Sequence, residues 1–169
     1  NRLRLLFDKQ KKYAEAEAEY REAIRLDPNE SYAHNNLGSI LYDQKNYTDA
    51  EAQYREAIRL KPNNHYAHVN LGDLFAYQKK YTEAEAEYKE AIRNSPSYAR
   101  AHYGLGSVLS EQKKYDEAEA AMNEAIRLAP KDANAHNALG NTLVSQKKYA
   151  QAEAQFREAT HLDPVSLIP

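Results

Sequence analysis

At 169 residues the chain has the length of one domain, and its 23 Lys and Arg residues nearly balance its 25 Asp and Glu residues. This balance, without a long basic run, disfavours a nucleic-acid-binding surface. No apolar run approaches the ~20 residues that span a bilayer, so we expect no membrane span and no signal peptide. Cysteine is absent, which excludes disulfides and zinc–thiolate sites. Reducing and oxidising compartments are both compatible with this composition, and we favour the cytoplasm.

The sequence repeats with a period of 34 residues. The period is marked by the glycines Gly38, Gly72, Gly106 and Gly140 and by the prolines Pro28, Pro62, Pro96, Pro130 and Pro164. A fixed period of this length is typical of a stacked array of one supersecondary unit. We therefore predict a single solenoid over 1–169. Its parts are a partial first repeat at 1–30, full repeats at 31–64, 65–98, 99–132 and 133–166, and a tail at 167–169.

Each repeat is predicted to contain two helices. The first repeat begins inside its first helix, has Arg4 where later repeats have glycine, and should turn near Lys11. In the second repeat, apolar residues at helical spacing predict one helix around Leu37 and another around Tyr54. The expected N-caps are Asn29, Asn63 and Ser97 for the first helices and Thr48, Thr82 and Asp116 for the second. A proline then closes each unit.

The last repeat departs from the others. Ala150 replaces the capping residue, Thr160 replaces isoleucine and His161 replaces arginine, as expected of a terminal repeat. We interpret the array as ending here, with the helix face around Phe156 and Ala159 left partly open. This interpretation predicts a homo-oligomer that associates through the open ends or by an exchanged tail.

The pattern resembles the tetratricopeptide repeat, a helix-turn-helix unit of about 34 residues. The second repeat supplies its characteristic residues: His34, Leu37, Gly38, Leu41, Ala50, Tyr54, Ala57 and Pro62. Histidine stands where the family commonly has Trp or Tyr, and Met122 replaces the second aromatic residue in the fourth repeat. The resemblance implies an all-α, right-handed superhelical solenoid of stacked antiparallel helix pairs. It also implies a non-catalytic protein–protein interaction scaffold that binds an extended peptide or a helix in its concave groove.

The resemblance places the groove at the second, fifth, sixth, ninth, twelfth and thirteenth positions of each first helix. The candidate peptide-binding residues at these positions are Tyr32, Asn35, Asn36, Tyr66, Asn70, Asp73, Tyr77, Arg100, Tyr103, Asn137 and Asn141. Tyrosine is enriched at interfaces, and an asparagine ladder such as Asn36 and Asn70 can hold a peptide backbone. Alternatively, Tyr32 and Tyr66 only cover the repeat junctions.

The charges of this groove indicate the kind of ligand. Chaperone-binding members of the family carry a carboxylate clamp, of which only Asn70 and Arg100 are matched here. With Asp43, Asp73 and Glu111 in the groove, the expected partner is a neutral or mildly basic protein segment.

We predict no catalytic residue, no cofactor and no metal site. The recurrent histidines His34, His68, His102 and His136 are too far apart to share an ion, because packed helices lie about 8–10 Å apart. They are predicted to fill the core. Two alternatives to the peptide scaffold stay open: a self-assembling module that associates through its ends or the tail Val165 to Pro169, and the regulatory or targeting part of a larger enzyme.

Overall fold

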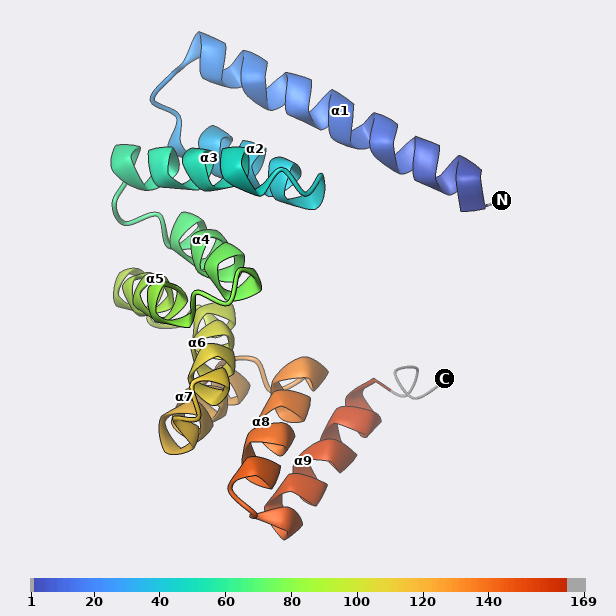
Figure 1. Ribbon diagram of the computed structural model, residues 1–169, viewed down its shortest axis with the longest axis vertical. Coiled ribbons are helices and arrows are strands. Elements are labelled where there is room, and N and C mark those ends of the chain that lie inside the picture. Colours follow the sequence, from blue (N-terminus) through green and yellow to red (C-terminus); the bar gives the residue numbers. More distant parts are fainter. Residues whose placement is uncertain (1, 164–169) are drawn as a thin grey trace.

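The computed structural model describes residues 2–163, with side chains from residue 12 onward, so the predicted tail at 167–169 lies outside this range. The described residues form nine α-helices and no strand. In chain order these are α1 (Arg2–Leu26), α2 (Ser31–Asp43), α3 (Tyr47–Leu60), α4 (His65–Tyr77), α5 (Tyr81–Asn94), α6 (Ala99–Glu111), α7 (Tyr115–Leu128), α8 (Ala133–Ser145) and α9 (Tyr149–Leu162). Stacked as antiparallel pairs, they form a curved all-α solenoid, as predicted (Figure 1). No helix in this range is long and apolar enough to cross a membrane.

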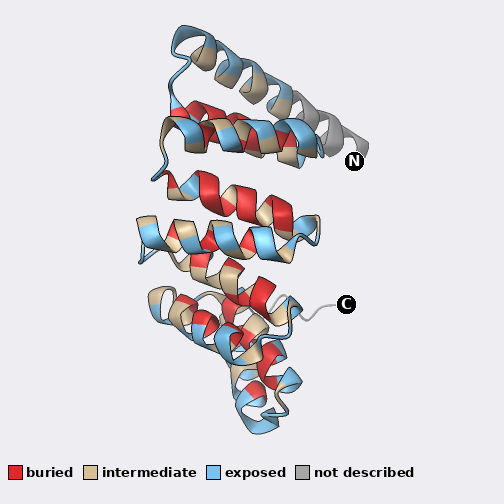
Figure 2. Ribbon diagram, turned by 60° about the vertical axis from the view of Figure 1, so that its left-hand side comes forward, coloured by how far each residue is buried: buried red, intermediate tan, exposed pale blue. Residues whose placement is uncertain are grey.

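The solenoid has an inner and an outer layer of helices. Successive inner helices contact one another, α2 with α4, α4 with α6 and α6 with α8. Within the described residues, α3, α5, α7 and α9 contact inner helices only. Because inner helices approach one another more closely than outer helices do, the stack curves toward the inner layer. Figure 2 shows buried residues concentrated along the inner helices and on the faces of the outer helices that meet them.

Each turn from an inner to an outer helix contains a lysine in the left-handed region. Lys45, Lys79, Lys113 and Lys147 have φ values of 64°, 60°, 62° and 63°. After α2, the N–H of Asn46 donates to the carbonyl of Leu41 and the N–H of Lys45 to that of Tyr42, both at 2.8 Å. These two bonds form a Schellman motif. A left-handed conformation costs a non-glycine residue about 1–2 kcal/mol, which packing of the two helices must offset.

The recurrent glycine permits that close packing. A Cβ atom at Gly38 would lie 2.7 Å from the ring of Tyr54, a distance that real Cβ contacts do not reach. The same relationship joins Gly72 to Tyr88, Gly106 to Met122, and Gly140 to Phe156. Glycine on the inner helix therefore leaves room for a large side chain from the outer helix.

The first repeat lacks this relationship, and the turn predicted near Lys11 is wrong. Helix α1 continues through that position as a single helix. Arg4 stands at the glycine position, and Tyr20 is the equivalent of the buried tyrosine Tyr54. The first repeat thus lacks the glycine that permits close packing of the two helices in the later repeats.

The predicted helix starts are also displaced. The N-caps of α2, α4 and α6 are Glu30, Asn64 and Tyr98, one residue later than predicted. The outer helices α3, α5 and α7 begin at Tyr47, Tyr81 and Tyr115, one residue before the predicted caps. Asn64 is buried, and its side-chain amide also donates to the Ser31 hydroxyl at 2.9 Å. This contact joins the start of α2 to the start of α4, which explains why the buried asparagine serves as the cap.

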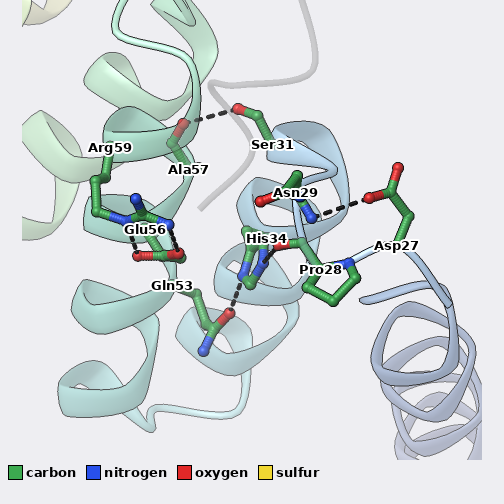
Figure 3. Close-up of polar contacts among 9 residues, drawn as sticks. All are labelled: Asp27, Pro28, Asn29, Ser31, His34, Gln53, Glu56, Ala57 and Arg59. Atoms are coloured by element: carbon green, nitrogen blue, oxygen red, sulfur yellow. Dashed lines mark hydrogen bonds and ion pairs between the residues drawn. The ribbon is translucent and has the colours of Figure 1, made fainter. Parts of the chain in front are cut away.

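A histidine links the closing proline of one repeat to the outer helix of the next. Nε2 of His34 lies 3.2 Å from the Pro28 carbonyl oxygen, and Nδ1 lies 2.8 Å from the Gln53 amide (Figure 3). The same bridge joins His68 to Pro62 and Glu87, and His136 to Pro130 and Gln155. His34, His68 and His136 are buried, as a core role requires, whereas His102 is half-buried.

Candidate peptide-binding groove

A network of polar side chains lies where α2 meets α4. The Asn70 amide nitrogen donates to Asn35 Oδ1 at 2.9 Å and to Ser39 Oγ at 3.3 Å. Asn35 is buried, with 5% of its surface exposed, and donates in turn to Asn36 Oδ1 at 3.3 Å. Asn35 therefore supports the network from below, while Asn36 and Asn70 stay half-exposed. The side chains expected to form a ladder are held in place before any ligand arrives.

Asp73 forms the centre of a second network, between α4, α5 and α6. Its Oδ1 accepts a hydrogen bond from the Tyr88 hydroxyl at 2.6 Å, and its Oδ2 pairs with Arg100. Burial and the charge of Asp73 both raise the pKa of Tyr88. Burial acts to lower the pKa of Arg100, but the charge and hydrogen bond of Asp73 raise it above its usual value. Arg100 therefore stays charged, and Tyr88 stays protonated, at physiological pH.

The asparagine ladder stops at Gly104 for a steric reason. Gly104 occupies the helix position of Asn36 and Asn70. A Cβ atom there would collide with the ring of Tyr88, which extends to Asp73. The ring fills the space that a third asparagine would need.

These networks border a pocket of about 220 Å³ on the exposed face of the inner layer. Its lining residues are Ser39, Tyr42, Asp43, Asn70, Asp73 and Arg100. The structure thus brings together three of the predicted site residues, Asn70, Asp73 and Arg100. Ser39, Tyr42 and Asp43 occupy the ninth, twelfth and thirteenth positions of α2, which the resemblance assigns to the groove, although they were not among the candidate peptide-binding residues. Position within the inner helix is the signal that identifies them.

Two aromatic clusters lie at the ends of α4. At its C-terminal end, Tyr77 packs with Tyr42 and Tyr47, at ring-centroid distances of 6.2 and 4.8 Å. At its N-terminal end, Tyr66 packs with His65 and Tyr98, at 4.1 and 5.4 Å. Tyr66 and Tyr77 are 43% and 58% exposed. At 1.5 Å per residue, α4 separates them by about 16 Å.

The remaining predicted residues lie apart from this pocket. Tyr32 is exposed and accepts a hydrogen bond from the Lys61 ammonium at 3.0 Å. Tyr103 is half-buried against the core cluster that contains Met122. Asn137 and Asn141 lie on α8, which contacts α6 but neither α2 nor α4. The structure therefore divides the predicted residues between a group on α2, α4 and α6 and a separate pair on α8.

No group of His, Asp or Glu in the described part of the chain is arranged to hold a metal ion. The histidine ring nitrogens of His34, His68 and His136 are instead committed to the proline carbonyls and to the outer-helix side chains.

The repeat architecture and the inner-layer groove define the class of protein. The family model for the tetratricopeptide repeat matches residues 4–65, 69–133 and 109–166. The chain belongs to the tetratricopeptide repeat family, which confirms the resemblance seen in its sequence. Proteins built from this repeat are generally non-catalytic, and this chain is a protein–protein interaction scaffold whose partners are proteins or peptides.

Solved structures share this fold. MamA from Desulfovibrio magneticus RS-1 has 22% sequence identity and a TM-score of 0.80, over 95% of this chain and 90% of that chain. PilF of Pseudomonas aeruginosa has 23% identity and a TM-score of 0.83, over 95% and 73%. YrrB, described as a TPR protein with an unusual peptide-binding site, has 20% identity and a TM-score of 0.74, over 95% and 82%. No curated protein matches the chain at a significant level.

Proposed function

We propose that the concave face of α2, α4 and α6 binds an extended peptide segment of a partner protein. The observation that carries this proposal is a polar pocket flanked by two exposed tyrosines. Tyr66 and Tyr77 lie at opposite ends of α4, with Asn70 and Asp73 between them. Tyrosine gives a large contact area at a low cost in side-chain entropy, which suits it to anchor a ligand.

The asparagine side chains provide hydrogen bonds to the peptide backbone. The Asn70 nitrogen is occupied by Asn35 and Ser39, whereas no described residue donates to its Oδ1. That oxygen can accept a hydrogen bond from a peptide N–H. Because the amide is already oriented, binding costs little further ordering.

The charge of the pocket favours a neutral or basic segment. Arg100 offsets the charge of Asp73, whereas Asp43 forms no ion pair within the described residues. The pocket therefore carries a net negative charge, which attracts lysine or arginine in the ligand. Added salt weakens this contribution because it screens exposed charges.

Selection of peptides from a random display library tests the proposal. Binders selected on the native chain should lose at least about tenfold in affinity for the Tyr66→Ala, Tyr77→Ala double variant. Asn70→Ala should also weaken them. Tyr149→Ala is the matched control, because Tyr149 is 64% exposed on α9, outside the groove. Circular dichroism establishes that all variants are folded. Equal affinity for native and double-variant chains would contradict the proposal.

A second candidate function is self-association, favoured by the exposed face of α9. Val144, Tyr149, Ala152, Phe156 and Thr160 are among the residues that border a mostly apolar pocket of about 440 Å³ there. In earlier repeats, the equivalent face carries the next inner helix. Sedimentation across a range of concentrations tests this candidate, with Val144→Asp expected to reduce any dimer. A constant monomer mass would exclude it.

A further inference from the structure

The fourth repeat differs from its neighbours at one histidine. In the second, third and fifth repeats, Nδ1 of the histidine lies 2.7–2.8 Å from the side chain 19 residues later: Gln53, Glu87 or Gln155. The equivalent of these residues in the fourth repeat is Ala121. Nε2 of His102 still contacts the Pro96 carbonyl at 2.8 Å. Nδ1 of His102 has no hydrogen-bond partner among the described residues.

The missing side chain leaves a pocket on the outer face, between α5 and α7 and above α6. Its volume is about 430 Å³, and both His102 and Ala121 line it. The other walls are largely apolar, formed by Ile92, Leu105 and Leu109. The next groove along the stack, between α7 and α9, is about 310 Å³. It keeps the equivalent leucines, Leu139 and Leu143, but is also bordered by polar side chains: Glu119, Asn123, Gln151 and Gln155. The groove therefore recurs along the stack, whereas the open space beside the histidine is particular to the fourth repeat, where Ala121 replaces the glutamine or glutamate.

The rim of the pocket is negatively charged. Lys89 pairs with Glu85 at 2.6 Å, and Glu124 pairs with Arg127 at 2.6 Å. Glu117 lines the same rim and forms no ion pair within the described residues. A ligand with a positive charge beside its apolar part would complement this rim.

The hydrogen bonding of the His102 ring determines which polar group such a ligand must carry. A carbonyl oxygen only accepts, so the Nε2 that contacts Pro96 carries the proton. In the neutral ring, Nδ1 is then an acceptor that faces the space left by Ala121. A ligand that fills the pocket and satisfies Nδ1 must combine an apolar body with a hydrogen-bond donor at its tip. A phenol ring has both features.

We propose that this outer pocket binds a tyrosine side chain of a partner protein, with the phenol hydroxyl donating to His102 and a neighbouring basic residue facing Glu117. This second site lies on the opposite side of α6 from the groove proposed above and does not depend on it. A single partner segment rich in tyrosine and lysine would satisfy it.

Binding of p-cresol, the side chain of tyrosine, tests the site directly. In NMR titrations of the isotopically labelled chain, p-cresol should shift the methyl signals of Leu105 and Leu109 and the ring signals of His102. Toluene, which lacks the hydroxyl, should bind about two- to tenfold more weakly, because one hydrogen bond is lost. Shifts confined to the inner-face tyrosines, equal affinities for toluene and p-cresol, or no binding would each overturn the proposal.

Ala121→Gln supplies the matched variant. Glutamine stands at this position in the second and fifth repeats, so the variant should fold. Its side chain should occupy the pocket, pair with Nδ1 of His102 and weaken p-cresol binding at least about tenfold. Ala154→Gln, on the equivalent outer face of α9, is the control and should bind p-cresol as the native chain does. Undiminished binding to the Ala121→Gln variant would overturn the proposal.

The tripeptides Lys-Tyr-Lys and Glu-Tyr-Glu test the charge of the rim. The basic tripeptide should bind the native chain more tightly than the acidic one. Glu117→Gln should reduce that preference. If the acidic tripeptide binds equally well, the assignment of a basic neighbour is wrong.

Discussion

Nδ1 of His68 lies 2.7 Å from a carboxylate oxygen of Glu87. On the other side of the ring, Nε2 lies 2.9 Å from the Pro62 carbonyl oxygen. Both ring nitrogens thus face acceptors, an arrangement that only the charged imidazolium satisfies. Burial acts to lower the pKa of His68, but its hydrogen bonds to Glu87 and Pro62 raise the pKa above its usual value.

This pKa shift predicts a pH-dependent stability. A histidine whose pKa is raised on folding stabilises the native state fully below its unfolded pKa, and this contribution is lost as pH rises through the folded pKa. We expect the His68 contribution to the free energy of unfolding to decrease from about pH 6 to about pH 8. Glu87→Gln should flatten the measured slope. Gln53→Glu, which places a carboxylate beside His34, should steepen it.

Urea unfolding across this pH range measures these slopes. The other histidines are common to all three chains, so only the differences between slopes are compared. Identical slopes in the native chain and the Glu87→Gln variant would show that the His68 pair does not titrate as expected.

Close packing at the recurrent glycine predicts a second effect. Gly38→Ala should lower the free energy of unfolding by about 1–3 kcal/mol, because its Cβ would meet the buried Tyr54 ring. Gly106→Ala should cost less, because its Cβ would meet Met122, whose side chain is flexible. Alanine also favours the helix by about 1 kcal/mol over glycine, which offsets part of each loss. Chemical denaturation ranks the two variants, and a greater loss at Gly106 would refute this explanation.

The two buried tyrosine hydroxyls should differ in their contribution to stability. Tyr88 donates to the charged Asp73 at 2.6 Å, so Tyr88→Phe should cost about 1.5–3 kcal/mol. The Tyr54 hydroxyl lies 3.4 Å from the neutral Ser39 hydroxyl, so Tyr54→Phe should cost about 1 kcal/mol or less. Both changes remove one oxygen from a buried ring. Equal losses in urea unfolding would show that Asp73 adds nothing to the Tyr88 contact.

The hydrogen bonds of Glu85 predict a contribution to the free energy of unfolding that is lost at acidic pH. It accepts hydrogen bonds from Lys89, Lys114 and Gln112, and those from Lys89 and then Lys114 chiefly lower its pKa to about 2. A lowered folded-state pKa stabilises above the unfolded pKa, and this contribution is lost as pH falls through the folded value. Glu85→Gln should therefore cost up to about 1 kcal/mol at neutral pH and reduce the loss of stability between about pH 5 and about pH 2.

Glu153→Gln is the control for this prediction. Glu153 is largely exposed and, within the described residues, forms an ion pair only with Arg157, at 2.6 Å. Its replacement should change the free energy of unfolding very little. Thermal unfolding at a series of acidic pH values distinguishes the two variants.

The fold could be predicted from sequence because packing positions recur. Each full repeat has a glycine at the position of Gly38 and a large side chain at the position of Tyr54. The packing pattern is therefore seen four times in the sequence. The first repeat was predicted wrongly because the lysine pair at Lys11 suggested a turn, although Arg4 stands where the later repeats have the packing glycine. The start of α4 was missed by one residue because its cap is Asn64, whose side chain contacts Ser31 at the start of α2.

The sequence predicted which helix positions line the candidate site, but not the contacts that their side chains make with neighbouring repeats. The sequence placed Asn70, Asp73 and Arg100 on one face, and the structure brings them to one pocket. It did not reveal that Asn35 is buried or that Tyr103 joins the core, because both outcomes depend on neighbouring repeats. The outer pocket at Ala121 was also missed. Its signal, an alanine where three repeats have an amide or a carboxylate, becomes meaningful once His102 is seen to point toward it.

Among the described residues, the outer helices pack against inner helices and not directly against one another, so packing between outer helices does little to set the angle between neighbouring repeats. A ligand side chain bound between α5 and α7 would hold these two helices at one separation and thereby fix the curvature of the array. Occupancy of the outer face would then alter affinity on the inner face, and by linkage the effect would be mutual.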